Sequence, residues 1–100
     1  MIDTPIYARN IKFLRQIRGD TQGEIAALLE KKSKVAIGMI ENGDNGMNVR
    51  DLMKLADYFG VAETELLRKQ FWRMSDEEIA ALKTRWGEAA DTAKEALKAV

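Results

Sequence analysis

Residues 21–43 read TQGEIAALLEKKSKVAIGMIENG, and this stretch decides the fold of the 100-residue chain. Thr21 and Glu24 stand three residues apart, which is the spacing of a capping box at the start of a helix. Apolar residues follow at the spacing of one buried helical face: Ile25, Leu28 and Leu29. The sequence therefore predicts a short helix that begins after Thr21 and stops at the polar residues Glu30-Lys31-Lys32.

A second short helix is predicted directly after this polar break. Ser33 is a suitable N-cap, and a second buried face follows at helical spacing: Ala36, Ile37 and Ile40. The helix is expected to end before the turn signal Asn42-Gly43-Asp44-Asn45-Gly46. Two short helices joined by a tight basic turn indicate a protein that reads DNA.

Helical patterns also flank this pair. The first covers about residues 6–18, with Pro5 in its first turn and Gly19 as its end. Another begins at Asn48, ends at Gly60 and has one apolar face: Leu52, Leu55, Ala56 and Phe59. A further short helix from about Ala62 is expected to bury two leucines, Leu66 and Leu67. These patterns predict an all-α fold, with a five-helix domain over residues 6–68.

A C-terminal helical extension, residues 69–100, is predicted after this domain. Its helix begins at the capping box Ser75–Glu78 and carries an a/d heptad seam: Ile79, Leu82, Trp86, Ala89, Ala93, Ala96 and Val100. We expect dimerisation through residues 66–100, in which the aromatic residues Phe71 and Trp72 join Ile79, Leu82 and Trp86. The alternative is a helix that packs back on its own domain.

The composition argues against catalysis. The chain has no cysteine and no histidine, which removes the thiolate nucleophile, the commonest general base and the commonest metal ligand. We therefore expect no enzyme activity, no metal and no cofactor. No apolar run approaches the ~20 residues of a membrane span, and residues 1–5 lack the pattern of a signal peptide. The expectation is a soluble, cytoplasmic protein without a membrane partner.

The charge is zero overall but unevenly distributed. The chain holds 16 basic and 16 acidic residues, whereas nucleic-acid-binding domains are usually basic. Residues 1–34 hold seven basic and four acidic residues, and residues 35–67 hold two basic and six acidic ones. Because a binding face needs only local positive charge, the neutral total does not exclude DNA as the partner.

The order of these elements resembles the phage-repressor and Cro type of helix-turn-helix protein, often called the XRE family. The resemblance covers about residues 6–67 and implies a lambda-repressor-like five-helix domain that binds double-stranded DNA. The matching pieces occur in order: Ile11-Lys12-Phe13-Leu14-Arg15, Arg18-Gly19-Asp20-Thr21-Gln22, Glu24-Ile25-Ala26 with Leu29, Ile37 with Ile40-Glu41-Asn42-Gly43, Leu52-Met53-Lys54-Leu55-Ala56, Phe59-Gly60-Val61 and Leu66-Leu67.

The turn after Leu29 departs from the family pattern. Family members usually place glycine, an apolar residue and serine before the third helix, whereas Glu30-Lys31-Lys32-Ser33 is one residue longer and has no glycine. Aligning the end of the third helix puts Ser33 at its start and keeps Ile37 and Ile40 buried. Aligning the second helix instead would shift the DNA-reading face by one residue. We adopt the first alignment.

The recognition helix is expected to lie in the major groove, with its N-terminal half facing the base edges. With the apolar face buried, four residues point outward: Lys34, Val35, Gly38 and Met39. Lys34 can donate to guanine O6 and N7, and Val35 can contact a thymine methyl group. Since few hydrogen-bonding readers are present, specificity is expected to rest partly on DNA shape.

Phosphate contacts are expected on both sides of this helix. The resemblance implies such contacts for Gln22 and Asn42. The basic turn is placed to do the same through Lys31, Lys32 and Ser33. The resemblance also implies a buried ion pair between Arg15 and Glu41, which would link the first helix to the end of the third.

These expectations combine into a homodimeric transcriptional repressor of the phage or prophage type, which binds a near-palindromic operator. Two alternatives stay open. One is an activator, in which acidic residues around Asp51 and Asp57 contact polymerase. The other is an antitoxin, in which residues 70–100 bind a toxin partner while the same domain binds the operator.

Overall fold

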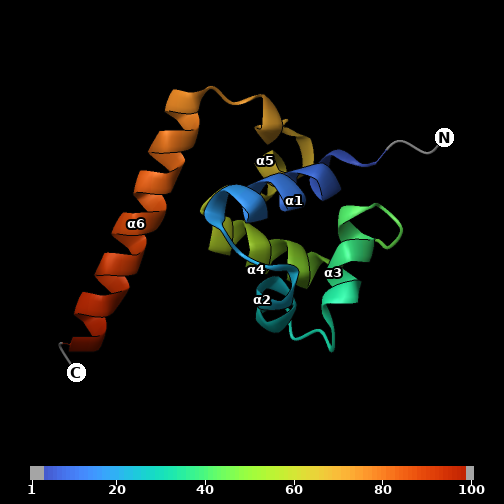
Figure 1. Ribbon diagram of the computed structural model, residues 1–100, viewed down its shortest axis with the longest axis horizontal. Coiled ribbons are helices and arrows are strands. Elements are labelled where there is room, and N and C mark those ends of the chain that lie inside the picture. The colour runs from blue at the N-terminus through green and yellow to red at the C-terminus, as the bar shows by residue number, and fades with distance from the viewer. Residues whose placement is uncertain (1–3, 99–100) are drawn as a thin grey trace.

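The computed structural model describes the backbone of residues 4–98 and the side chains of residues 4–88 (Figure 1). This part of the chain forms six α-helices and one short 3₁₀ helix: α1 (Ile6–Arg18), α2 (Gln22–Leu28), α3 (Lys34–Glu41), α4 (Val49–Phe59), α5 (Glu63–Arg68), η1 (Phe71–Arg73) and α6 (Asp76–Lys98). The all-α prediction is confirmed. The 3₁₀ turn η1 was not predicted from the sequence, and the seam residues Ala89, Ala93, Ala96 and Val100 have side chains outside the described residues.

Side-chain caps start α2, α3 and α4 where the sequence places them. The backbone N–H of Glu24 donates to the Thr21 hydroxyl over 3.1 Å, and the Glu24 carboxylate accepts from the Thr21 N–H. Ser33 caps α3 through its hydroxyl, and Asn48 caps α4 through its side-chain oxygen. Each cap satisfies a backbone N–H that has no partner within the helix.

Two helices end at glycines in the left-handed region. Gly19 follows α1 with φ 86°, and Gly60 follows α4 with φ 67°. At both ends the N–H of the residue after the glycine donates back to a carbonyl five residues earlier in the chain, which stops the helix in a Schellman motif. A residue without a Cβ adopts this conformation at little cost.

One hydrophobic core unites all these elements, and every helix contributes to it. Its buried members are Ile11, Leu14, Ile25, Ala26, Leu29, Ile37, Ile40, Leu55, Ala56, Phe59, Leu66, Phe71 and Leu82. Phe59 and Phe71 are the largest of the fully or almost fully buried side chains. Since Phe71 and Leu82 belong to the predicted extension, the extension and the five-helix domain share this core.

The buried polar residue Asn10 fastens the extension to α1. Its side-chain amide donates to the carbonyls of Leu66 and Lys69, over 2.8 and 2.6 Å, and its oxygen accepts from the Phe71 N–H over 3.1 Å. These bonds satisfy backbone groups at the end of α5 and the start of η1, which would otherwise be buried without partners.

Helix α6 attaches to the C-terminal end of α4. The indole N–H of Trp86 donates to the carbonyl of Phe59 over 2.8 Å, and Arg85 donates to the carbonyl of Gly60. Figure 1 shows α6 at one side of the molecule and α3 at the other. The contacts from Trp86 and Arg85 satisfy carbonyls at the end of α4, which have no partner within that helix.

Three sequence expectations need correction. Phe71 and Leu82, expected at a dimer interface, are buried in the core of their own chain. For Phe71 the reason is the turn after α5, which brings η1 against α1. Leu67, expected to be buried, is 42% exposed, since Leu66 is the residue of α5 that faces the core. The other expected interface residues, Trp72, Ile79 and Trp86, are half-buried, and dimerisation itself stays a prediction.

Within residues 4–98, none of the helices combines the length and the apolar character that a membrane crossing requires.

Candidate nucleic-acid interface

The turn between α2 and α3 is built around a residue with an unusual backbone conformation. Glu30 has φ 57°. Among the residues that the structure describes, it is the only one other than glycine with a positive φ. The N–H of Lys31 donates to the carbonyl of Ala26 over 2.8 Å, so α2 ends in the same Schellman motif that glycine forms elsewhere in the chain. The turn therefore achieves with glutamate what glycine would achieve without strain.

The start of α3 follows the alignment that we adopted. Ser33 is the N-cap, and α3 begins at Lys34. Ile37 and Ile40 are buried, while Lys34 is exposed, Val35 is 62% exposed and Met39 is 38% exposed. The outward face of α3 thus offers one cation and two apolar side chains.

Gly38 lies beneath a side chain of α2. A Cβ atom built on Gly38 would stand 3.6 Å from Nε2 of Gln22, which is an ordinary contact distance. Gly38 is half-buried, in contrast to the open position expected from the sequence. The amide of Gln22 covers it and leaves less backbone accessible at this point of α3.

The amide of Gln22 belongs to a network centred on Glu41. Arg15 binds the Glu41 carboxylate with two N–H groups, Nε to Oε2 over 2.6 Å and Nη2 to Oε1 over 3.1 Å. Gln22 Nε2 donates to Oε1 over 3.2 Å, and Arg15 Nη1 donates to the carbonyl of Asp20 over 3.0 Å. The expected ion pair between Arg15 and Glu41 is therefore present, and it joins α1, the α1–α2 turn, α2 and α3.

The basic turn is only partly free to meet a ligand. Lys31 Nζ lies 2.8 Å from Oδ2 of Asp51, which ties the turn to the first turn of α4. Lys32 and Ser33 are exposed. Asp51 is buried, so the acidic surface expected around Asp51 and Asp57 is reduced to Asp57, which is exposed.

The residue that follows the end of α3, Gly43, packs closely against Pro5 in the N-terminal segment. Gly43 has φ 81°, and a Cβ atom there would come within 2.7 Å of Cδ of Pro5. Asn42, immediately before it, is exposed. Glycine is required at position 43 for two independent reasons: its left-handed backbone and the close approach of Pro5.

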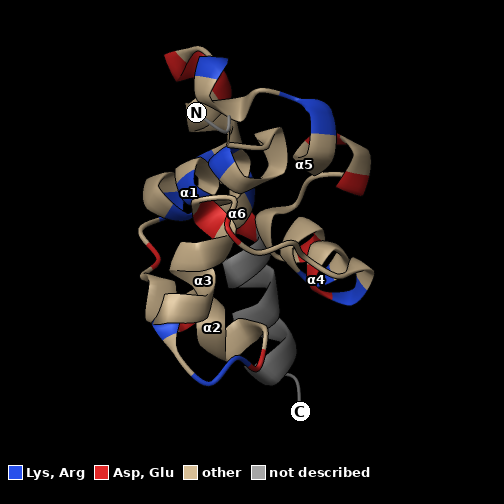
Figure 2. Cartoon of the chain, turned by 90° about the vertical axis from the view of Figure 1, so that its right-hand side faces the viewer, with Lys and Arg blue, Asp and Glu red and all other residues tan. Residues whose placement is uncertain are grey.

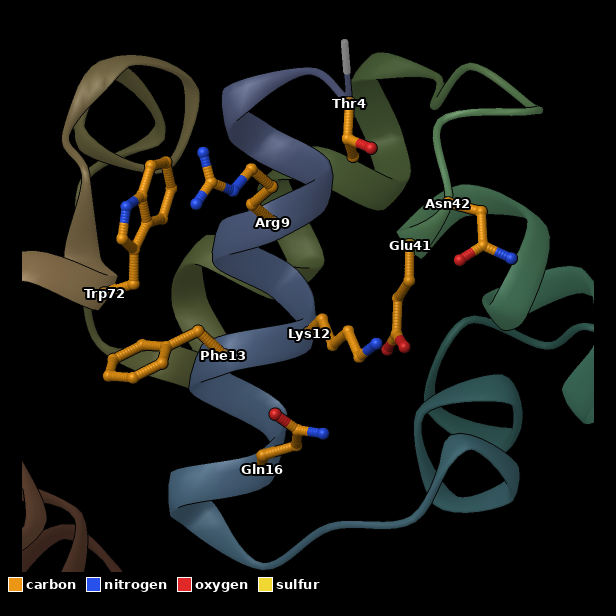
Figure 3. Close-up of a pocket in the computed structure, with 8 residues that line it drawn as sticks. All are labelled: Thr4, Arg9, Lys12, Phe13, Gln16, Glu41, Asn42 and Trp72. Atoms are coloured by element: carbon orange, nitrogen blue, oxygen red, sulfur yellow. The ribbon is translucent and has the colours of Figure 1, made fainter. Parts of the chain in front are cut away.

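A groove runs along the outward face of α1, between η1 and the end of α3 (Figure 3). Its volume is about 330 Å³, and its lining comes from three parts of the chain: Thr4, Arg9, Lys12, Phe13, Gln16, Glu41, Asn42 and Trp72. Figure 2 shows lysines and arginines on α1 and again at the start of α3 in the same view. Among the described residues, no group of three or more carboxylate, imidazole or thiolate side chains is arranged to hold a metal ion.

Some residues of this framework were not predicted from the sequence. In the sequence, Asn10 is one polar residue among several in the amphipathic pattern of residues 6–18. Tyr58 donates to Oδ2 of Asp20 over 2.9 Å and stacks under the guanidinium of Arg18, which holds the α1–α2 turn against α4. Burial of the Tyr58 hydroxyl and its bond to Asp20 raise its pKa, although the nearby charge of Arg18 opposes this shift.

The structure combines a capped α2, a tight turn and an outward-facing α3 on a five-helix core. This arrangement defines a helix-turn-helix domain, the DNA-binding part of a transcription regulator. The comparison with protein families agrees, since the helix-turn-helix family matches residues 11–66, more than half of the chain. The chain belongs to the helix-turn-helix family. No curated protein and no solved structure gives a significant match.

Proposed function

We propose that the protein is a homodimeric transcriptional repressor of the phage or prophage type, which places α3 of each subunit in the major groove of a near-palindromic operator. The observation that carries this proposal is the outward face of α3. Lys34, Val35 and Met39 are exposed there on a helix whose opposite face is buried in the core. Repression would follow from occupation of the operator, which blocks access of polymerase.

The contacts divide by chemistry. Lys34 donates to guanine in the major groove, Val35 contacts a thymine methyl group, and Met39 lies against sugar or base. Gln22, Lys32, Ser33 and Asn42 hold phosphates on either side, and Lys31 contributes from its ion pair with Asp51. Since Val35 and Met39 carry no hydrogen-bonding group and Gly38 is covered, sequence preference rests on few base contacts and on DNA shape.

Selection of binding sites from random DNA tests the proposal. A palindromic consensus with half-sites about 10 base pairs apart would agree with two copies of α3 on one face of the duplex. Lys34→Ala should relax base preference at one position, whereas Gln22→Ala should weaken binding to all sequences alike. Lys83→Ala, an exposed lysine of α6, is the matched control and should change neither. If Lys34→Ala and Gln22→Ala both bind like the wild type, α3 is not the reading helix.

The dimer needs a surface that the core leaves exposed. Apolar side chains remain on α4 and α5, where Val49 is 70% exposed, Met53 50% and Leu67 42%. Leu67 also borders a hollow of about 200 Å³ lined by Tyr7, Met47 and Leu52. Exposed apolar side chains that gather on one part of a surface are typical of a protein–protein contact. We assign the dimer contact to this α4–α5 face, together with the half-buried seam residues of α6.

Sedimentation velocity over a range of concentrations distinguishes the two parts of this surface. Leu67→Lys should shift the protein toward monomer if the α4–α5 face forms the contact, and Ile79→Lys should do so if α6 forms it. A monomer at all concentrations in the wild type would contradict the homodimer. It would also favour the antitoxin alternative, in which a toxin covers the same apolar side chains.

A further inference from the structure

The outward face of α1 carries two cations that the helix-turn-helix contacts do not use. Arg9 and Lys12 are three residues apart, so they lie on the same face of the helix, and both are exposed. The other two cations of α1 are engaged, Arg15 with Glu41 and Arg18 with Asp20. Since α1 contains no acidic residue, Arg9 and Lys12 give this face a local positive charge.

Trp72 holds the guanidinium of Arg9 in place. The guanidinium carbon lies 3.8 Å from the centre of the indole ring, and Figure 3 shows the two groups side by side. Stacking fixes the orientation of the guanidinium but leaves its N–H donors, which lie in the plane, free for an anion. A stacked arginine is thus prepared for the bidentate geometry that a phosphate accepts.

The groove adjoins two residues that we assign to DNA phosphates. Asn42 lines it directly, and Gln22 donates to Glu41, which forms part of the same wall. The Glu41 carboxylate presents little negative charge to the groove, because its side chain is 1% exposed and Arg15 binds it with two N–H groups. Arg9 and Lys12 therefore line the same groove as Asn42.

We propose that Arg9 and Lys12 bind the phosphodiester backbone of DNA in the α1 groove, with Trp72 as the positioning residue for Arg9. The helix-turn-helix domain then contacts the duplex over a wider area than α2, the turn and α3 alone provide. The inference rests on the proposed orientation of α3 on DNA. It gives the 3₁₀ turn η1 a binding role, since η1 carries Trp72.

The salt dependence of DNA binding by the full chain tests this site. The slope of log K against log salt concentration falls by about 0.9 for each phosphate contact that is lost. Arg9→Ala and Lys12→Ala should each lower the slope by this amount, on the operator and on random duplex alike. Between 50 and 200 mM salt, the affinity deficit of each variant should therefore shrink by about 3.5-fold. Lys83→Ala is the control and should keep the wild-type slope.

Variants of Trp72 provide a second test in the same salt-dependence experiment. Trp72→Leu should reduce the slope as Arg9→Ala does, whereas Trp72→Phe should preserve it, because a phenyl ring can still stack on a guanidinium. If Trp72→Leu is unfolded by circular dichroism, the two cation variants decide the question alone. Wild-type slopes for folded Arg9→Ala and Lys12→Ala would overturn the inference. If Arg9→Ala and Lys12→Ala keep the wild-type slope while Lys34→Ala loses base preference, the α1 site is refuted and the proposed function stands. If Lys34→Ala and Gln22→Ala bind DNA like the wild type, the proposed function itself is refuted.

Discussion

Replacing Glu41 by glutamine is expected to lower the free energy of unfolding by about 3–5 kcal/mol, the usual cost of removing one partner from a buried ion pair. The Arg15 side chain is 11% exposed and that of Glu41 is 1% exposed, so solvent screens the pair very little. Glutamine keeps the shape of Glu41 but leaves the Arg15 charge without a counter-charge. The loss is a large part of the roughly 5–15 kcal/mol that stabilises a domain of this kind.

Urea unfolding followed by circular dichroism measures this loss, and a double variant sharpens it. Arg15→Met with Glu41→Leu replaces both charges by apolar groups of similar size, which is often neutral. The double variant should therefore recover most of the stability that Glu41→Gln loses, although the bonds to Gln22 and Asp20 are also gone. If the double variant is as unstable as the sum of its single changes, Arg15 and Glu41 do not act as a pair and the reasoning fails.

Three further outcomes follow from the backbone and from one tyrosine. Glu30→Gly should stabilise the protein by about 0.5–1 kcal/mol in thermal unfolding, since it removes left-handed strain, and Glu30→Ala should not. Gly43→Ala should lower the melting temperature and weaken DNA binding, because the new Cβ would meet Pro5 and displace the end of α3; an unchanged melting curve would refute this. The raised pKa of Tyr58 means that the folded state retains its phenolic proton more tightly than the unfolded state does. This stability is fully present below pH ~10 and is lost as the pH rises through the folded-state pKa, so Tyr58→Phe should flatten the alkaline decline of the unfolding free energy.

The sequence predicts the helices well because each is marked by local chemistry. Thr21, Ser33 and Asn48 are cap residues whose effect depends on their own few neighbours. The start of α3 was also predictable, since only one alignment keeps Ile37 and Ile40 buried. The left-handed conformation of Glu30 was not, because glutamate rarely takes it.

What the sequence does not predict is the partner of a polar or apolar side chain across the fold. Asn10 and its partners are separated by more than 50 positions, and no spacing rule connects them. Phe71 lies on a short apolar segment that suits an interface as well as a core. Only the turn after α5, which brings this segment against α1, decides between the two.

The shared core has a consequence for how the chain can be divided. A fragment that ends after residue 68 would lack Phe71 and Leu82, and the amide of Asn10 would lose its partners at Lys69 and Phe71. Such a fragment would open a cavity beneath α1, the helix whose Arg15 binds Glu41 at the end of α3. A protease that cuts between α5 and α6 would therefore release a destabilised helix-turn-helix domain, and loss of the C-terminal helix would weaken DNA binding.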